Sequence, residues 1–290
     1  MFPANLMAPH VGQRGTKLSP RLWARLVETQ MTADGGASGL MLYDDFNSFP
    51  NLTVTTAAGQ LQPPSGYFAY IEADATVGSI KQEADKPSVI TLTTSTDTSD
   101  GDNHDTILAT NGNTGVLGMI SDTAADAKLL VCEFRFRLPS VTNNDGSIFL
   151  GLGEEGLAAA NTPIQDASGH TFSSDDIIGF YIDESDRDAL NFWYRKAGSP
   201  TQELWTWPTA LVADTWYNVG FVYDPSAEAG KRIKIFVNNE EQSSYVTSDL
   251  IAASTFPDGE ELAMYAAIKG SANNDPQSVD LDFWAFYQAG

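Results

Sequence analysis

Three aspartates crowd one short turn of the sequence, in the segment DESDRD at the end of a strand-like run. Asp183, Asp186 and Asp188 offer carboxylate oxygens, which are the ligands that calcium prefers. Aspartate is also common in solvated hairpin turns, because its side chain hydrogen-bonds to nearby backbone. Two interpretations stay open, a calcium site and an ordinary acidic turn, and the ordinary turn is favoured. The same two interpretations apply to a second acidic segment, which contains Asp97, Asp100, Asp102 and Asp105.

Three tryptophans in the second half of the chain could form an aromatic platform for a sugar. Trp205 and Trp207 alternate in the run LWTW, so they share one face of a short strand, and Trp193 is near them in sequence. Core packing is the commoner fate of tryptophan in a β-sandwich, because the ring buries a large apolar area. The pattern therefore predicts either core residues, which we favour, or a glycan-binding surface.

The histidines do not indicate a catalytic centre. His10, His104 and His170 are far apart in sequence, and none accompanies a plausible nucleophile. A Ser-His-Asp triad or a histidine metal site therefore has no support. No glycine-rich phosphate-binding loop is present in the sequence either.

Alternating apolar and polar residues predict that strands carry these side chains. The alternation is clearest in residues 129–138, 176–183, 189–196, 215–224, 232–240, 261–269 and 278–288. About a dozen such runs follow one another from residue 40 to residue 290, with no helical stretch among them. The pattern is typical of a single all-β antiparallel sandwich or barrel. Its predicted core contains Phe134, Phe136, Phe180, Ile182, Phe192, Val222, Ile235, Leu281 and Phe283, and in the last strand Val279, Leu281, Phe283, Ala285 and Tyr287 are expected to share one face.

Residues 1–39 form a separate N-terminal arm in this interpretation. Ser19-Pro20 is a typical helix start, and an apolar stripe at helical spacing follows it. Residues 32–39, TADGGASG, have the composition of a flexible linker. The stripe is too short to fold alone, so it packs either on its own sandwich or on another chain. We expect it to bind a partner through Arg14, Lys17, Leu18, Arg21, Leu22, Trp23, Arg25 and Leu26.

Charge and cysteine content narrow the class of protein further. The formal net charge of -22 argues against nucleic acid or an anionic membrane as a partner, because both would repel the chain. Cys132 is the single cysteine, so no intrachain disulfide forms, and its place in an alternating run predicts a buried thiol. The first residues contain no apolar signal-peptide core, and no run of 18 apolar residues exists. We therefore expect synthesis in a host cytoplasm.

The strand runs resemble the concanavalin A-like lectin/glucanase superfamily, in its laminin G-like and pentraxin-like variants. The resembling stretches are VCEFRFRLPS, IGFYIDESDRDALNFWYRKAG, DTWYNVGFVYDP, KIFVNNEE and VDLDFWAFYQ. The resemblance implies an antiparallel jelly-roll β-sandwich over residues 40–290, preceded by the extended arm with its short helix. The opening LYDDFNSFP before such a domain is also similar to structural proteins of tailed-phage virions, which decorate capsids or build fibres.

Glucanases of that superfamily carry the motif Glu-x-Asp-x-x-Glu, in which two glutamates act as nucleophile and acid. Retaining hydrolysis requires two carboxylates about 5 Å apart. No candidate here completes the motif, because Glu72-x-Asp74 leads to Val77, Glu83-x-Asp85 to Ser88 and Glu184-x-Asp186 to Ala189. A fold by itself does not determine an activity, so hydrolysis by this route is not expected.

These observations lead to three ordered expectations for function. The first is a non-enzymatic virion protein, a capsid decoration or surface protein held through its arm by a capsid or other virion protein, and forming a homo-oligomer. The second is a lectin-like module that recognises glycans on a host surface. The third is a glycoside hydrolase. No cofactor is expected apart from calcium, should the acidic turn bind it.

Overall fold

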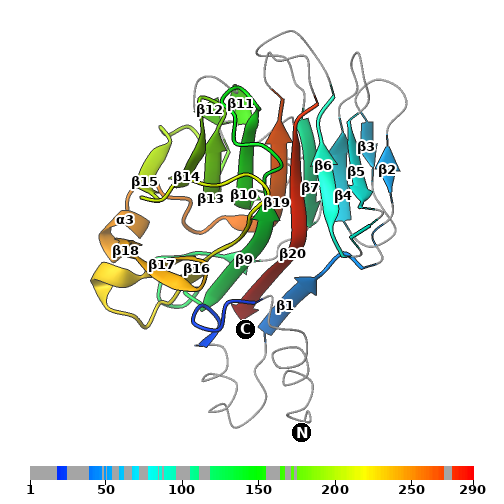
Figure 1. Ribbon diagram of the computed structural model, residues 1–290. Helices are drawn as coiled ribbons and strands as arrows, with labels where there is room; N and C mark the ends of the chain where they lie inside the picture. The colour runs from blue at the N-terminus through cyan, green and yellow to red at the C-terminus, as the bar shows by residue number, and fades with distance from the viewer. Residues whose placement is uncertain are drawn as a thin grey trace, which may run out of the picture.

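The described residues form two nine-stranded antiparallel sheets packed face to face, with a small two-stranded sheet beside them (Figure 1). The structure is a computed structural model that describes residues 18–24, 39–47, 49, 51–53, 59–61, 67–71, 78–83, 85–86, 88–95, 105–110, 118–154, 164–166, 171–172, 175–270 and 276–290. The described helices are one short α-helix, α3 (Ser248–Ile251), and one 3₁₀ turn, η1 (Ala229–Lys231). The predicted all-β sandwich is therefore confirmed.

The first sheet combines strands from both ends of the chain. Its order is β18 (Glu240–Val246), β17 (Ile233–Val237), β16 (Trp216–Tyr223), β9 (Leu130–Arg137), β20 (Ser278–Ala289), β6 (Ile90–Thr93), β5 (Ser79–Gln82) and β2 (Leu52–Thr53). Strand β1 (Gly39–Asp44) pairs with the second half of β20, from Asp44 opposite Trp284 to Gly39 opposite Ala289. The first described strand and the last one therefore lie side by side.

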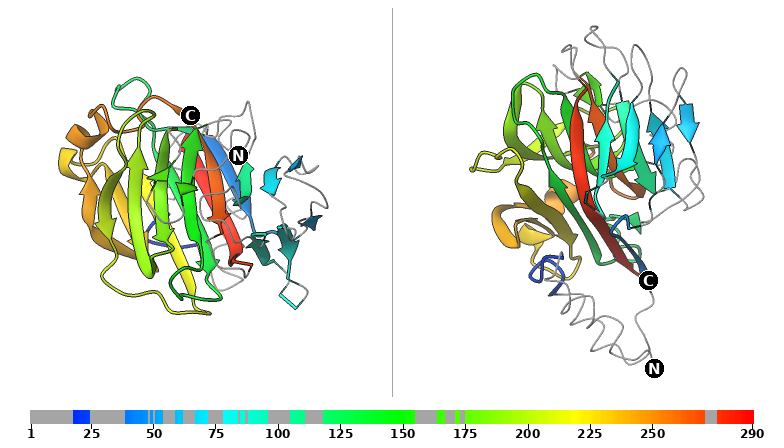
Figure 2. Two further views of the ribbon diagram at one scale, coloured as in Figure 1. Left: turned by 90° about the horizontal axis from the view of Figure 1, so that it is seen from above. Right: turned by 45° about the vertical axis from the view of Figure 1, so that its right-hand side comes forward.

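The second sheet lies behind the first in Figure 1, and Figure 2 shows the two layers from further directions. Its order is β15 (Gln202–Thr206), β14 (Asp186–Arg195), β13 (Ile177–Asp183), β10 (Ser147–Glu154), β19 (Glu261–Lys269), β7 (Asp105–Thr110), β4 (Tyr67–Ile71) and β3 (Gly59–Leu61), with β8 (Gly118–Met119) paired to β19. The small sheet pairs β11 (Ile164–Asp166) with β12 (Thr171–Phe172). Neighbours such as β10 and β19 are distant in sequence, as a jelly roll requires.

The core between the sheets holds most of the predicted residues. Phe134, Phe136, Phe180, Ile182, Phe192, Ile235 and Leu281 are all buried there. Phe180 and Phe192 pack edge to face with ring centroids 5.2 Å apart, a favourable aromatic geometry. Cys132 is also buried, and that burial, followed by the neighbouring Glu133 charge, raises the pKa of its thiol well above the usual value.

Two predicted core residues are on the opposite face. Val222 lies opposite Val131 on the outer face of the first sheet, because Phe221 is the residue that points inward beside Cys132. Phe283 is also on the outer face, since the register between β20 and β9 shifts between Leu281 and Phe283. A β-bulge adds one residue and inverts the alternation beyond it. The prediction that residues 279–287 share one face is therefore wrong: Val279 and Leu281 face the core with Trp284 and Phe286.

The helix predicted from Ser19 onward is only partly visible. Residues 20–22 form a turn, in which the Trp23 amide donates to the Ser19 carbonyl over 3.1 Å, and a helical conformation is reached at Ala24. Residues 25–38 lie outside the described part of the chain. Within that part, no helix combines the length and the apolar character that crossing a membrane would need.

Candidate functional site

The outer face of the second sheet carries a buried cluster that includes four aromatic side chains. This second-sheet cluster comprises Ile107, Ala109, Phe149, Ile164, Ile177, Tyr181, Trp193, Ala263, Tyr265 and Ala267, all at most 3% exposed. Trp193 and Tyr181 pack with ring centroids 4.5 Å apart. Ile164 belongs to β11, so the small sheet contributes to covering this face. The same face also carries buried polar side chains: the Tyr181 hydroxyl donates to the Asp183 carboxylate at 3.2 Å, and Lys269 of β19, opposite Ser147, is 0% exposed.

The three tryptophans proposed for a sugar platform do not come together. Phe192 faces Trp205 across the β14–β15 pair, so Trp205 lies on the core side and Trp193 on the outer side. Trp207 packs against the core and meets Tyr217 at 5.8 Å between ring centroids. The platform is therefore wrong as a joint site, and the alternative of core packing is correct for Trp205.

The acidic turn is organised by hydrogen bonds within the hairpin between β13 and β14. The Asp183 carboxylate is 1% exposed and accepts from the Ser185 amide at 2.7 Å and the Ser185 hydroxyl at 2.6 Å. Asp186 is exposed, and slight desolvation and then its hydrogen bond with Asp188 raise its pKa. Within the described residues, no group of three or more His, Cys, Asp or Glu side chains could hold a metal ion. Asp183 is therefore held in a buried, hydrogen-bonded turn, whereas Asp186 is exposed to solvent, and calcium binding by Asp183, Asp186 and Asp188 stays a prediction.

Several other predicted residues lie outside the described part of the chain. They are Asp97, Asp100 and Asp102 of the second acidic segment, Glu72 and Asp74 of the first Glu-x-Asp pair, and Arg14, Lys17, Arg25 and Leu26 of the arm. Asp105 begins β7. Glu83 accepts a hydrogen bond from the Thr91 hydroxyl at 3.0 Å on the first sheet. Glu184 is buried beside the hairpin turn, 5% exposed.

Residues 18–24, called here the N-terminal segment, dock on the outer face of the first sheet. Leu22 and Trp23 are 1% and 6% exposed, and they pack on a first-sheet cluster of Val131, Val222, Phe236, Phe283, Ala285 and Tyr287. Both side chains are therefore buried against the first sheet of the same chain. Their expected role in binding another chain is therefore corrected. The alternative in which the stripe packs on its own sandwich holds for both.

A buried carboxylate fixes the N-terminal segment in place. Glu133 of β9 is fully buried and accepts from the Ser19 amide at 3.0 and 3.2 Å and from the Trp23 indole Nε1 at 2.5 Å. The Asn218 side-chain amide donates to it at 3.0 Å. Burial raises the pKa of Glu133, and these hydrogen bonds from Ser19, Asn218 and Trp23 lower it in part. Alternation alone predicts that Glu133 points outward, but it cannot predict the segment that covers it.

The apolar outer face continues from the first-sheet cluster onto β1. Met41 lies opposite Tyr287 and Tyr43 opposite Ala285, so both side chains point to the same outer face. Tyr43 stacks on Phe283 with ring centroids 5.8 Å apart. Met41 is nevertheless 40% exposed and Tyr43 38%. An exposed apolar strip therefore runs beside the docked N-terminal segment.

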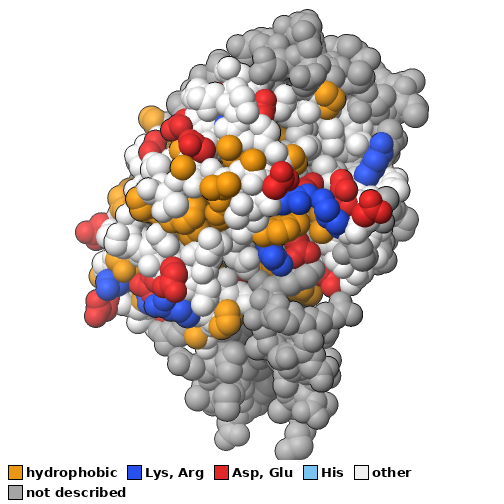
Figure 3. Space-filling view, viewed as in Figure 1, with side chains coloured by type: hydrophobic (Ala, Val, Ile, Leu, Met, Phe, Trp, Pro, Cys, Tyr) orange, Lys and Arg blue, Asp and Glu red, His pale blue; other side chains and the backbone are white. Residues whose placement is uncertain are grey.

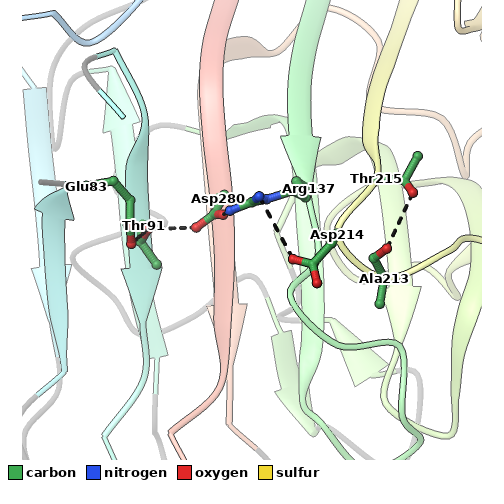
Figure 4. A network of polar contacts seen from close by, with 7 residues as sticks. All are labelled: Glu83, Thr91, Arg137, Ala213, Asp214, Thr215 and Asp280. Carbon is green, nitrogen blue, oxygen red and sulfur yellow. Dashed lines mark hydrogen bonds and ion pairs between the residues drawn. The ribbon is translucent and has the colours of Figure 1, made fainter. Parts of the chain in front are cut away.

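The other half of the same outer face is charged and internally paired. Arg137 donates through Nε to Asp280 at 2.9 Å, and the Thr91 hydroxyl donates to the other Asp280 oxygen at 2.6 Å (Figure 4). The guanidinium carbons of Arg135 and Arg137 each lie 5.2 Å from the centre of the Trp216 ring, in cation–π geometry. In the space-filling view, side chains of opposite charge sit together beside a band of hydrophobic side chains (Figure 3).

No protein-family model matches the sequence, and no curated protein matches it. Solved structures do match in fold. Peanut lectin aligns with a TM-score of 0.52 at 15% identity, covering 87% of this chain and 98% of the lectin. A protein of unknown function from Shewanella oneidensis MR-1 aligns at 0.51 with 17% identity, covering 91% and 92%. The catalytic domain of an endo-1,3-beta-glucanase from Thermotoga petrophila RKU-1 aligns at 0.50 with 9% identity, covering 87% and 99%. The chain accordingly has the jelly-roll fold of the concanavalin A-like lectins and glucanases.

Proposed function

We propose that this chain is a non-enzymatic structural protein of a virion, a decoration or surface protein that attaches to the particle through β1 and its surroundings. The observation that carries the proposal is the distribution of exposed hydrophobic residues. Of the four large ones in the described residues, Met41 and Tyr43 share the outer face of β1, Leu40 lies on the other face of the same strand, and the fourth is Val212. Single exposed apolar residues are ordinary, whereas a contiguous group indicates an interaction surface.

The position of β1 strengthens this proposal. In the described part of the chain, β1 pairs with the second half of β20, at the border of the first-sheet cluster. The N-terminal segment docks on the first-sheet cluster that β1 extends. A partner that covers β1 would therefore contact a surface already ordered by Glu133, which lowers the entropy cost of binding.

The test uses particles from the source that lack this chain, to which purified chain is added. Wild-type chain should bind at saturation. The Met41→Glu/Tyr43→Glu double variant should bind more weakly, because burying the remaining exposed parts of both side chains contributes about 1–3 kcal/mol, or roughly tenfold to hundredfold in affinity. The matched control is Val212→Glu, which changes the other exposed apolar residue and should bind as wild type. Equal binding by the double variant, or no binding by wild type, would overturn the proposal.

The absence of catalysis is part of the same proposal. The sequence completes no Glu-x-Asp-x-x-Glu motif, and Glu184 of the last Glu-x-Asp pair is buried at the hairpin turn. Purified chain should release no sugar from β-glucans or other polysaccharides. Release of sugar that Glu184→Gln abolishes would contradict the proposal.

A lectin-like role is the second candidate, since peanut lectin is among the structural neighbours and such folds carry glycan sites in some proteins. A glycan array separates the two candidates. Selective binding of a neutral glycan by isolated chain, combined with no attachment to particles, would favour the lectin-like role.

A further inference from the structure

A cavity of about 240 Å³ lies at one end of the sandwich, away from the N-terminal segment and β1. The loop after β9, the start of β14 and the start of β20 enclose it. The lining residues are Pro139, Ser140, Asp145, Arg187, Pro276, Gln277 and Ser278. Its volume approaches the lower end of small-molecule sites, which span about 300–1,000 Å³.

Arg187 is the feature of this cavity that calls for a ligand. The residue is 1% exposed, and its Nη1 donates to the Gly146 carbonyl. Its Nε is buried and has no hydrogen-bond acceptor. No carboxylate of the described residues lies within ion-pair distance of this guanidinium. A buried cation is costly unless it is paired and hydrogen-bonded, and Arg187 forms no direct ion pair although Asp145 and Glu184 are near it.

Arg187 keeps its charge at neutral pH in spite of this burial. Burial lowers the pKa of Arg187 to about 10, and the nearby charges of Asp145 and Glu184 and the Tyr181 phenol act in the opposite direction. The guanidinium is therefore protonated and can bind an anion. Arginine suits carboxylate and phosphate in particular, because two of its N–H groups can donate to two oxygens at once.

The other residues that line the cavity favour a carboxylate over a phosphate as the bound anion. Asp145 places a negative charge at the same cavity, which disfavours a dianion such as phosphate more than a monoanion. A carboxylate side chain only accepts hydrogen bonds, so it suits a ligand hydroxyl. Ser140 and Ser278 add hydroxyl groups that can donate or accept.

We propose that this cavity binds a small hydroxylated carboxylate, such as a sugar acid. Its carboxylate pairs with the Arg187 guanidinium at the cavity wall, and its hydroxyl groups donate to Asp145 and contact Ser140. This site is independent of the attachment surface at β1. The chain would thus bind an acidic small molecule or an acidic sugar unit although its body is strongly acidic overall.

The experiment measures binding of D-glucuronate to the full chain by calorimetry, with the Arg187 Nε–H resonance followed by NMR. D-glucose is the matched neutral probe, and inorganic phosphate tests the anion alone. Glucuronate should bind and shift the Nε–H resonance, and glucose should do neither. Arg187→Lys keeps a cation but removes the paired donors, so affinity should fall roughly tenfold to hundredfold. Arg232→Lys is the control, because Arg232 lines a different cavity, of about 330 Å³.

A second variant covers the case in which Arg187→Lys does not fold. Ser140 is partly exposed at the cavity lining, so Ser140→Phe should fill the cavity without touching the guanidinium. Loss of glucuronate binding in folded Ser140→Phe supports the proposal. Unchanged binding in Ser140→Phe, equal binding of glucose, binding of phosphate alone, or no binding of glucuronate would each overturn it.

Discussion

Replacing Glu133 with glutamine tests whether this carboxylate holds the N-terminal segment on the sheet. The glutamine carbonyl can still accept from the Ser19 amide and the Asn218 side chain, which both donate to Oε1 in the wild type. The glutamine NH₂ group then faces the Trp23 Nε1–H, which donates to Oε2 over 2.5 Å in the wild type. Two donors opposite each other leave the indole N–H without an acceptor, which costs about 1–3 kcal/mol.

The favourable and unfavourable free energies of docking residues 18–24 are of similar size, so the loss of one hydrogen bond is large enough to shift the segment toward the undocked state. Burying Leu22 and Trp23 contributes about 3–6 kcal/mol. The hydrogen bonds from Ser19 and Trp23 to the charged carboxylate contribute about 3–6 kcal/mol together. Fixing the backbone of residues 18–24 costs about 7–14 kcal/mol. The two sides agree to within a few kcal/mol, and the ratio of undocked to docked segment should rise roughly tenfold to hundredfold in the variant.

Limited proteolysis with trypsin measures that population directly. Cleavage after Arg21 requires the segment to leave the sheet, because the Arg21 amide donates to Asn239 at 2.7 Å when docked. When opening and closing are fast, the cleavage rate follows the open fraction. The Glu133→Gln chain should therefore be cut after Arg21 faster than wild type, by up to roughly a hundredfold. Glu261→Gln, at an exposed position on β19, is the matched control and should be cut at the wild-type rate. Equal cleavage of Glu133→Gln and wild type would refute the anchoring role.

Three further predictions concern the sandwich itself. Phe134→Ala should lower the free energy of unfolding by about 3–5 kcal/mol in urea titrations, because the ring is fully buried and packs on Trp284; a loss below about 1 kcal/mol would contradict its place in the core. Burial raises the pKa of Asp176 to about 6, so its contribution to stability is complete below about pH 4 and is lost as pH rises toward 6. Asp176→Asn should remove that decline from pH-dependent melting curves, and an identical profile in the variant would argue against it. A chelator should leave the melting temperature unchanged, because the Asp183 carboxylate is occupied by Ser185; a lower melting temperature would restore the calcium interpretation.

Local patterns in the sequence predict the strands and most of the core, because alternation is a property of single strands. The alternation of Cys132, Phe134 and Phe136 identifies the inward face of β9 without knowledge of its neighbours. The pattern LWTW likewise places Trp205 and Trp207 on one side, and both pack toward the core. The pairing of one strand with another is not contained in these local patterns. The sequence does not show that Trp193 lies on the opposite face from Trp205, since this depends on how β14 and β15 pair.

The candidate sites were harder to predict for the same reason. Arg187 is the single basic residue in an acidic turn, which suggests a solvated side chain, and only the packing of three distant segments around it reveals a buried cation beside a cavity. The burial of Glu133 is equally hidden in the sequence. Its alternation with Arg135 indicates an exposed position, but a segment more than a hundred residues away in sequence covers it. Burial of a polar residue on an outer face depends on tertiary contacts that single-strand periodicity does not contain.

One irregularity in the last strand connects the fold to the proposed attachment surface. The register shift between Leu281 and Phe283 turns Phe283, and with it Ala285 and Tyr287, to the outer face of the first sheet. Regular alternation would have kept these residues in the core and presented Trp284 and Phe286 outside. Because of the shift, the outer face gains an apolar area that Leu22 and Trp23 cover on one side and Tyr43 on the other. The docked N-terminal segment and the exposed strip on β1 therefore depend on one bulge, and a surface built from strand register in this way has no motif in the sequence by which to recognise it.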